Sequence, residues 1–462
     1  MNYDLIVLGS GPAGYVAAIR ASQLGLKVAV VERSELGGIC LNWGCIPTKA
    51  LLKSATVFES IKHASDYGIS VEAPKADIGA MVKRSRDVAA GMSTGIQFLF
   101  KKNKIEKING FGKLLPGKKI EVTDGDGKKS IYSANHIIIA TGARSRELPN
   151  LKQDGKKVIG YREAMTLAKQ PESMLVVGSG AIGSEFAYFY NAIGTKVILV
   201  EYLPNIVPIE DEDVSKQLGR SFKKQGIEVL TNAAVESVDT SGKKCKVSIK
   251  TKKGTQEEEV DVVLSAVGIT SNIEGIGLEE CGINVENGKI KVDEYYRTNV
   301  NGIYAIGDII PGPALAHVGS AEGIICVENI AGMETETLDY NNIPGCTYCS
   351  PEVASVGYTE KAAKEAGYEI KVGKFPFSAS GKASAAGAKD GFVKVIFDAK
   401  YGECLGAHMI GYNVTEMIAE IVAVRKLETT AHEILKSVHP HPTMSEAVME
   451  ATAAALGEVI HM

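Results

Sequence analysis

Residues 5–14 read LIVLGSGPAG, a short apolar run followed by three glycines with the spacing G-x-G-x-x-G. The apolar run predicts a buried strand, and the residues that follow, through Leu24, predict a helix. Gly9 permits the tight turn, Gly11 lets the backbone approach a pyrophosphate, and Gly14 allows the helix to lie close to the strand. The N-terminus of the helix would then face the negative phosphates.

An acidic residue completes this pattern. A second apolar strand, Lys27–Val31, ends in Glu32, roughly 20 residues after the first glycine, where a carboxylate can accept hydrogen bonds from ribose hydroxyls. A glycine-rich turn alone is weak evidence, because such turns join many strands to helices. The strand, turn, helix, strand and acid together predict a Rossmann-like dinucleotide-binding unit.

The same arrangement returns later in the chain, which makes it an internal repeat on the scale of a domain. The strands expected there are Met174–Val177 and Thr195–Val200. The matching turn glycines and strand-end acid are Gly178, Gly180, Gly183 and Glu201. Two bound dinucleotides are therefore expected.

Glu201 also bears on which nucleotide the second unit binds. Its carboxylate would repel an adenosine 2′-phosphate, and no arginine follows in EYLPNIVP, residues 201–208. The second site is therefore expected to prefer NAD to NADP. The neighbouring Tyr202 can serve packing alone.

Composition and charge exclude several classes of protein. The chain has 462 residues, 45 % of them hydrophobic and 23 % charged, as in ordinary folded proteins of several domains. A net charge of -4 offers no basic field for nucleic acid. The start lacks a cationic leader, and no apolar run approaches the roughly 20 residues of a membrane span. A cytoplasmic protein without a membrane or nucleic-acid partner is expected.

Two of the eight cysteines lie close together in GGICLNWGCIPTK, residues 37–49. On a regular helix, residues five apart have Cα atoms about 8.6 Å apart, beyond the roughly 7 Å limit for a disulfide. Gly44 and Pro47 predict an irregular stretch, with Pro47 disfavouring helix at the residue before it. A bridge between Cys40 and Cys45 would suit thiol exchange. Two reduced cysteines packed under a loop are the alternative.

The second chemical signal is HPHPTMSE, residues 439–446. Either histidine, His439 or His441, can accept a proton from a thiol near neutral pH, and the carboxylate of Glu446 can orient such a base. A surface turn of histidines and prolines is the plainer alternative. A metal site is a weaker one, because no further ligand cluster lies nearby.

Other segments suggest how the chain is divided. The ATG of residues 140–142 ends a strand, and polar residues 144–157 mark a domain boundary. Asp308, after an apolar strand and a glycine, is placed to bind a polyol or phosphate, or is a plain turn residue. Past residue 340, alternating strands such as Phe392–Phe397 and amphipathic helices predict a separate α+β module. Those helices are expected at Val414–Arg425 and Ser445–Leu456.

Further cysteines are expected to be structural. Cys346 and Cys349 form C-x-x-C on a strand-like stretch, without the following helix or second C-x-x-C that a redox or zinc site requires. Buried strand thiols are expected there. The isolated cysteines are Cys245, Cys281, Cys326 and Cys404.

In this order, and over nearly the whole chain, these motifs resemble the flavoprotein disulfide reductases, the class I pyridine nucleotide-disulfide oxidoreductases, and among them the members that oxidise dihydrolipoamide. The quoted segments are joined in this resemblance by TNVNGIYAIGD and ALAHVGSAEG. It implies an α/β fold with two Rossmann-like domains, for FAD and NAD, and a C-terminal α+β dimerisation domain. The implied domains are residues 1–148 (FAD, redox disulfide), 149–270 (NAD), 271–340 (central) and 341–462 (dimerisation).

The resemblance also implies roles for the reacting residues. Cys40 corresponds to the interchange thiol that meets the substrate, and Cys45 to the thiol against the flavin. His441 corresponds to the base and Glu446 to its orienter, both reaching the site from the partner subunit. A monomer would then be inactive.

Lys49 and Glu185 match residues that pair beside the flavin, where a cation favours thiolate and anionic reduced flavin. Both also fit an ordinary helix surface. The first glycine turn is implied to hold FAD and the second NAD, without a metal. The expected cofactor contacts are Gly9, Gly11, Gly14, Glu32, Lys49, Thr141, Gly142, Asp308, Ala316, Gly178, Gly180, Gly183, Glu201 and Gly268.

The implied reaction is oxidation of protein-bound dihydrolipoamide with reduction of NAD+. The implied partners are a second copy of the chain and either the lipoyl domains and acyltransferase core of 2-oxoacid dehydrogenase complexes or the glycine cleavage lipoyl carrier. Another FAD-dependent disulfide reductase, or chiefly a docking subunit, is the alternative. Glutathione reductase would need cationic residues for NADP, and mercuric reductase a cysteine pair where this tail reads GEVIHM. Four residues, Ala13, Thr48, Pro440 and Met444, differ from those usual in the family. None of the four replaces a reacting group.

Overall fold

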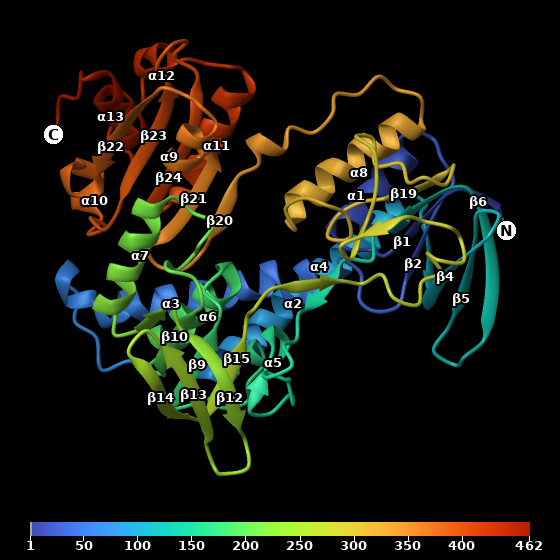
Figure 1. The fold of residues 1–462 in the computed structure, drawn as a ribbon, viewed down its shortest axis with the longest axis horizontal. Helices are drawn as coiled ribbons and strands as arrows, with labels where there is room; N and C mark the ends of the chain where they lie inside the picture. The colour runs from blue at the N-terminus through green and yellow to red at the C-terminus, as the bar shows by residue number, and fades with distance from the viewer. Residues whose placement is uncertain (1) are drawn as a thin grey trace. The chain divides into compact units, whose positions relative to one another are not determined.

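The computed structural model describes residues 2–462 and divides into two compact units (Figure 1). The first unit consists of the chain up to Ala50, Ala80–Arg146 and Gly268–Leu338. The second consists of Leu51–Gly79, Glu147–Val267 and Asp339–Met462. The four-domain division expected from the sequence stays a prediction.

The first unit is built on a mixed sheet with the order β3-β2-β1-β6-β5-β4, and β19 also pairs with β6. Its parallel strands are β3 (Glu106–Asn109), β2 (Val28–Glu32), β1 (Asn2–Leu8), β6 (Lys129–Ile139) and β19 (Ile303–Ala305). The antiparallel strands are β5 (Lys119–Thr123) and β4 (Phe111–Leu115). Strand β1 is buried from Leu5 to Leu8, as expected for a parallel strand covered on both faces.

Helix α1 (Pro12–Gln23) follows the first glycine turn and lies beside α8 (Ala316–Ile330) (Figure 1). The two helices approach closely because small residues line their contact. A Cβ on Gly323 would lie only 2.8 Å from the carbonyl oxygen of Ala13. The other elements of this unit are α2 (Gly38–Trp43), β7 (Ala143–Ser145), β16 (Ile269–Ser271), β17 (Val285–Glu286) and β18 (Lys289–Ile290). Helices α3 (Cys45–Lys62) and α4 (Ile78–Lys102) cross the boundary between the units.

The second unit repeats the parallel design in a sheet with the order β11-β10-β9-β15-β8. Its strands are β11 (Glu228–Thr231), β10 (Lys196–Glu201), β9 (Ser173–Val177), β15 (Val262–Ser265) and β8 (Val158–Ile159). An antiparallel sheet adds β12 (Ala234–Asp239), β13 (Cys245–Thr251) and β14 (Gly254–Val260). The helices of this part are η1 (Ala64–Tyr67), α5 (Tyr161–Ala164), α6 (Ala181–Ala192) and α7 (Glu212–Lys224).

The C-terminal part of this unit is an antiparallel sheet with the order β20-β21-β24-β23-β22. Its strands are β20 (Gly345–Thr347), β21 (Glu352–Gly357), β22 (Ile370–Pro376), β23 (Phe392–Asp398) and β24 (Cys404–Gly411). Its helices are η2 (Tyr340–Asn342), α9 (Glu360–Glu365), η3 (Phe377–Ala379), α10 (Gly381–Ala385), α11 (Val414–Lys426), α12 (Ala431–Lys436) and α13 (Glu446–Leu456). No helix within residues 2–462 is long and apolar enough to cross a membrane.

Strand β23 corrects one expectation. The alternation expected for Phe392–Phe397 is absent from its burial, because every residue of the strand is buried, Lys394 included. Val393 and Val395 belong to a core shared with α11 and α13, while Ile396 belongs to another shared with α9. The strand is thus covered on both faces.

Candidate functional site

Cys40 and Cys45 are joined in a disulfide, with their Cα atoms 4.7 Å apart. Helix α2 carries Cys40 and ends at Trp43, Gly44 follows it, and α3 begins at Cys45. A Cβ on Gly44 would lie 3.2 Å from the carbonyl oxygen of Ile39, so a larger residue would crowd this break. The interruption brings the two sulfurs together, which a continuous helix would prevent.

The effect expected of Pro47 is wrong. Ile46 and Pro47 are both helical, in the first turn of α3. Proline is tolerated there because backbone N–H groups in the first turn have no partner within the helix. The irregularity therefore lies at Gly44, between Trp43 and Cys45.

Helix α2 is held by side chains of α4 that the sequence motifs did not reveal. Asn42 is buried, donates to the carbonyl oxygen of Leu36 over 2.9 Å, and accepts from the hydroxyl of Ser93 over 2.8 Å. The guanidinium of Arg86 lies over the Trp43 ring, 4.4 Å from its centre, and donates to the Asn42 carbonyl. Burial lowers the pKa of Arg86. No local signal marks these residues, because their partners are distant in sequence.

The first glycine turn has the expected geometry. Gly9 adopts a φ of +103°, and a Cβ there would lie 2.3 Å from the carbonyl oxygen of Ala140. A Cβ on Gly14 would lie 2.0 Å from the carbonyl oxygen of Gly9, so α1 starts directly against the turn. A Cβ on Gly11 would meet nothing within 4 Å, which leaves its backbone open to a phosphate.

The strand-end carboxylate is bonded to this turn. Glu32 Oε2 accepts from the backbone N–H of Ser10 over 2.9 Å and from its hydroxyl over 2.7 Å. Glu32 Oε1 accepts from the N–H of Ser34 over 2.8 Å. A carboxylate has about four acceptor positions, so capacity remains for ribose hydroxyls.

Asp308 follows β19 and is held by its backbone rather than by its side chain. Its carbonyl oxygen accepts from the hydroxyl of Ser271 over 2.8 Å and from the ammonium of Lys289. Burial raises the pKa of Asp308, although Lys289 opposes the shift. Within residues 2–462 its carboxylate has no hydrogen-bond donor, an arrangement that suits a ligand rich in hydroxyl groups.

The other expected contacts of the first unit also lie on turns or at a helix start. Thr141 donates its hydroxyl to the carbonyl oxygen of Asn272 over 2.6 Å. Gly142 and Gly268 adopt positive φ values, of 69° and 107°. Ala316 is the first residue of α8, where backbone N–H groups favour an anion.

The second glycine turn reproduces the first almost atom for atom. A Cβ on Gly178 would lie 2.4 Å from the carbonyl oxygen of Ala266, and one on Gly183 would lie 1.9 Å from that of Gly178. A Cβ on Gly180 would again meet nothing within 4 Å.

Glu201 likewise corresponds to Glu32. Its Oε2 accepts from the N–H and hydroxyl of Ser179 over 2.9 and 2.6 Å, and its Oε1 from the N–H of Leu203 over 2.8 Å. This carboxylate is buried, whereas Tyr202 beside it is exposed. A fixed anion at this point supports the expected preference for NAD.

His441 and Glu446 form the expected pair of base and orienter. His441 Nδ1 lies 2.8 Å from Glu446 Oε1, while the side chain of His441 is 78 % exposed. Burial would raise the pKa of Glu446, but hydrogen bonds from the Thr443 N–H, at 2.7 Å, and from His441 lower it. The carboxylate therefore stays ionised and leaves Nε2 of His441 able to accept a proton.

A second histidine pair, which the sequence did not reveal, fixes the same segment. The side chain of His439 is 7 % exposed, and its Nε2 lies 2.7 Å from Glu420 Oε1 in α11. Its Nδ1 lies 3.0 Å from the carbonyl oxygen of Ser437. Because both partners only accept, both ring nitrogens donate and the imidazole is charged. The hydrogen bond to Glu420 raises the pKa of His439, although burial opposes it.

Glu185 and Lys49 lie in different units. Glu185 is buried in α6, and its Oε1 accepts from the N–H of Tyr348 over 3.0 Å. Lys49 lies in the second turn of α3. The expected pairing of the two stays a prediction.

The C-x-x-C of residues 346–349 differs from the expectation of two strand thiols. Only Cys346 lies on β20, and it is half-buried. Cys349 is buried in the turn between β20 and β21, where its thiol donates to the carbonyl oxygen of Pro351 over 3.2 Å. The strand ends there because β20 turns back to pair with β21.

Two protein-family models match the chain. The model of the pyridine nucleotide-disulphide oxidoreductases matches residues 3–323, and the model of their dimerisation domain matches residues 343–452. The chain belongs to this family. Membership confirms the expected oxidoreductase class, the two Rossmann-like domains with a dimerisation domain, and FAD and NAD as the cofactors of this pyridine nucleotide-disulphide oxidoreductase.

Individual relatives show which members of the family the chain is similar to. The dihydrolipoyl dehydrogenases of Zymomonas mobilis and Rhizobium etli are 49 % and 48 % identical, each over 100 % of this chain and 99 % of the relative. Among solved structures, LpdA from Mycobacterium tuberculosis gives a TM-score of 0.91 at 27 % identity, covering 97 % of this chain and 98 % of the other. The HOCl-induced flavoprotein disulfide reductase RclA from Escherichia coli gives 0.87 at 25 % identity, covering 98 % and 99 %.

The close contact at Gly14 gives a first prediction. Gly14→Ala is expected to destabilise the fold by about 1–3 kcal/mol and to reduce the flavin retained on purification, because the new methyl group overlaps the Gly9 carbonyl. The flavin-to-protein absorbance ratio and thermal unfolding measure both effects. Gly91→Ala in α4, with nothing within 4 Å of its Cβ, is the control. Full flavin content and unchanged stability in Gly14→Ala would contradict the assignment.

The His439–Glu420 pair gives a second prediction. Because the folded pKa of His439 is raised, its contribution to stability is complete below the unfolded value of about 6.5 and is lost as pH rises through the folded value. His439→Gln should therefore lower the unfolding temperature more at pH 6 than at pH 9. The exposed His432, changed to Gln, is the control. An equal loss at both pH values would refute a charged His439.

Proposed function

We propose that this chain oxidises protein-bound dihydrolipoamide to lipoamide and reduces NAD+ to NADH, by way of the Cys40–Cys45 disulfide and FAD. The observation that carries the proposal is that disulfide, formed at a helix break, in a chain that also holds the His441–Glu446 pair. Relatives named dihydrolipoyl dehydrogenase, 44–49 % identical over 98–100 % of the chain, support the choice of substrate.

The residues around the two glycine turns fit the two cofactors. In the first unit, the open backbone at Gly11, the strand-end Glu32 and the buried carboxylate of Asp308 would hold the pyrophosphate and the polyol parts of FAD. In the second, Gly180 and Glu201 would hold NAD. FAD, when bound, supplies the two-electron carrier between the disulfide and the nicotinamide.

The chain's own residues account for the exchange of sulfurs. His441 Nε2 accepts the proton of one substrate thiol, and the resulting thiolate attacks Cys40 Sγ, so that Cys45 leaves as a thiolate. The substrate's second thiol attacks the mixed disulfide at the substrate sulfur, and its proton passes to Cys40 as Cys40 leaves. The lipoyl ring closes, and the chain then holds the two electrons as the Cys40 thiol and the Cys45 thiolate, with the first proton on His441.

The neighbouring residues set the charges in this scheme. Glu446 holds the His441 ring and stabilises its cation once the proton has arrived. We assign Lys49 to the flavin side, paired with Glu185, where its cation would favour the thiolate of Cys45.

The dimerisation domain bears on how the active site is assembled. The match to a dimerisation domain supports a homodimer, and we propose that the disulfide of one protomer is served by His441 of the partner subunit. Lipoyl domains and the acyltransferase core of 2-oxoacid dehydrogenase complexes, or the glycine cleavage lipoyl carrier, would be the macromolecular partners. A cytoplasmic location belongs to this proposal.

Cys45→Ser tests the sulfur chemistry. The variant should retain its flavin but lose dihydrolipoamide-dependent NAD+ reduction to below about a thousandth of the wild-type rate, because no disulfide remains to be opened. Steady-state NADH formation measures it. Cys281→Ser, at a half-buried unbonded thiol of the same unit, is the control and should retain normal activity. Substantial activity in Cys45→Ser would rule out the proposed route.

His441→Gln tests the base. Loss of proton transfer should slow dihydrolipoamide-driven flavin reduction by about 10²–10⁴-fold without releasing flavin. Rapid-mixing absorbance measures that step directly, with His432→Gln as the matched histidine control. A variant that reacts at the wild-type rate would remove His441 from the mechanism.

A further inference from the structure

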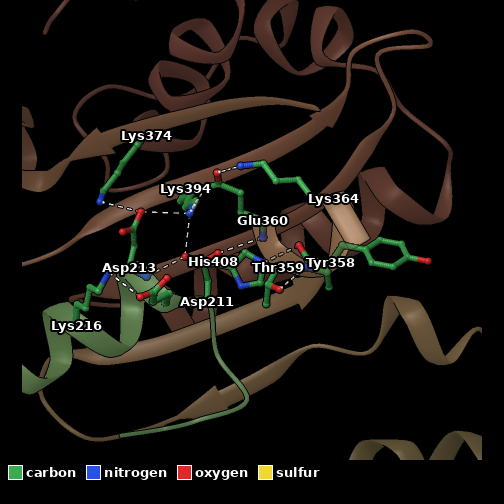
Figure 2. A network of polar contacts seen from close by, with 12 residues as sticks. Asp211, Asp213, Lys216, Tyr358, Thr359, Glu360, Lys364, Lys374, Lys394 and His408 are labelled. Atoms are coloured by element: carbon green, nitrogen blue, oxygen red, sulfur yellow. Dashed lines mark hydrogen bonds and ion pairs between the residues drawn. The ribbon is translucent and has the colours of Figure 1, made fainter. Parts of the chain in front are cut away.

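A lysine is buried in the C-terminal sheet. Lys394 on β23 is 3 % exposed, and its ammonium lies 2.8 Å from Glu360, 2.9 Å from Asp211 and 3.2 Å from Asp213. These carboxylates come from different elements that converge on the strand, as Figure 2 shows. Burying one cation among three anions is costly unless every group is compensated.

The remaining charge is balanced at the edge of the cluster. Lys374 lies 3.3 Å from Asp213, and Lys364 lies 2.6 Å from Glu360. Three lysines therefore face three carboxylates, and only Lys394 lies at the centre of the cluster (Figure 2). Hydrogen bonding and attraction to Lys394 lower the pKa values of Asp211 and Asp213 against the effect of burial.

A buried histidine lies next to Lys394. His408, opposite Lys394 on β24, is buried, and its Nε2 donates to the carbonyl oxygen of Tyr358 over 2.8 Å. Its Nδ1 has no partner within the described residues. Burial lowers the pKa of His408, and Lys394 lowers it further. Lys394 is thus the fixed cation that holds the acids on this face.

Asp211 carries the effect of this cation towards the nucleotide site. It caps α7 by accepting from the Asp213 N–H over 3.0 Å, and its other oxygen accepts from the Glu360 N–H over 3.2 Å. It also ends the segment of residues 202–211, which begins directly after Glu201. An aspartate can cap a helix without a buried lysine, so capping alone does not account for the ion pair between Asp211 and Lys394.

That segment rests against the second glycine turn. Val207 donates its N–H to the carbonyl oxygen of Ser179 over 3.1 Å and accepts from the N–H of Glu210 over 2.9 Å. Ser179 is the turn residue whose N–H and hydroxyl bind Glu201. Val207 adopts a φ of +41°, which a β-branched residue does not hold unless its surroundings impose it.

We propose that Lys394 is a positioning residue for the NAD site: by fixing Asp211, it holds residues 202–211 against the back of the glycine turn that receives the nucleotide. Without the cation, the facing carboxylates repel one another, Asp211 moves, and Val207 leaves its imposed conformation together with its bond to Ser179. No residue of this network takes part in the proposed exchange of sulfurs. Loss of Lys394 therefore weakens the nucleotide and spares the thiol chemistry.

The inference rests on the proposed function only in naming NAD as the nucleotide, so its test does not depend on turnover. The dissociation constant of NADH for the purified flavoprotein is measured by fluorescence titration. In Lys394→Met it should rise about tenfold, the scale of typical coupling between sites. The rate of flavin reduction by dihydrolipoamide is measured on the same preparation and should stay within about twofold of wild type.

Two further variants keep the test decisive. Lys394→Met/Asp211→Asn removes the cation together with one buried anion and retains a good helix cap, so it should fold even if the single variant does not. Because the side chain at position 211 no longer has the ion pair with Lys394 that fixes it, NADH binding should still be weakened. Lys364→Met, at the exposed edge of the cluster, should bind NADH normally.

Two results would overturn the proposal. The first is NADH affinity within about twofold of wild type in both Lys394 variants, whatever their thermal stability. The second is an equal loss of NADH affinity and dihydrolipoamide-driven flavin reduction, which would make Lys394 a general stabiliser of the fold. A chain that binds NADH but does not oxidise dihydrolipoamide would refute the proposed function and leave this test intact.

Discussion

Much of this molecule depends on one set of hydrogen bonds that occurs twice. In each unit, a serine inside the glycine turn gives its N–H and hydroxyl to the carboxylate that ends the next strand, as Ser10 does to Glu32 and Ser179 to Glu201. These hydrogen bonds join the turn to the end of the next strand. The surroundings of the two sets of hydrogen bonds differ: the first unit also holds the disulfide, and the second also holds the buried Lys394 cluster.

Nucleotide binding and thiol exchange depend on different parts of this arrangement. A rigid turn can accept a nucleotide without reorganising, whereas thiol exchange needs a bond that opens. The break at Gly44 supplies that bond between two helices, one of them fastened by Asn42 and Arg86 to α4. The exposed His441, oriented by Glu446, suits the proposed role of a base for a substrate carried on another polypeptide.

Sequence could predict the parts of the site whose cause is local. Glycine spacing, the strand-end acids and the alternative of a Cys40–Cys45 bridge follow from residues close together, and the structure has the bridge and the turns. Contacts between distant residues were missed: Arg86 on Asn42, Glu420 on His439, and the three acids around Lys394. Pro47 misled because its effect depends on its position in the helix, and β23 because helices cover both its faces.

The central claim is that dihydrolipoamide delivers its electrons to the disulfide before the flavin. Anaerobic titration of the purified protein with dihydrolipoamide, followed by absorbance, tests it directly. The account predicts that the first equivalent produces long-wavelength absorbance from a thiolate beside oxidised flavin, and that added NAD+ removes it. Bleaching of the flavin with the first equivalent, without such a band, or no reaction at all, would contradict the account.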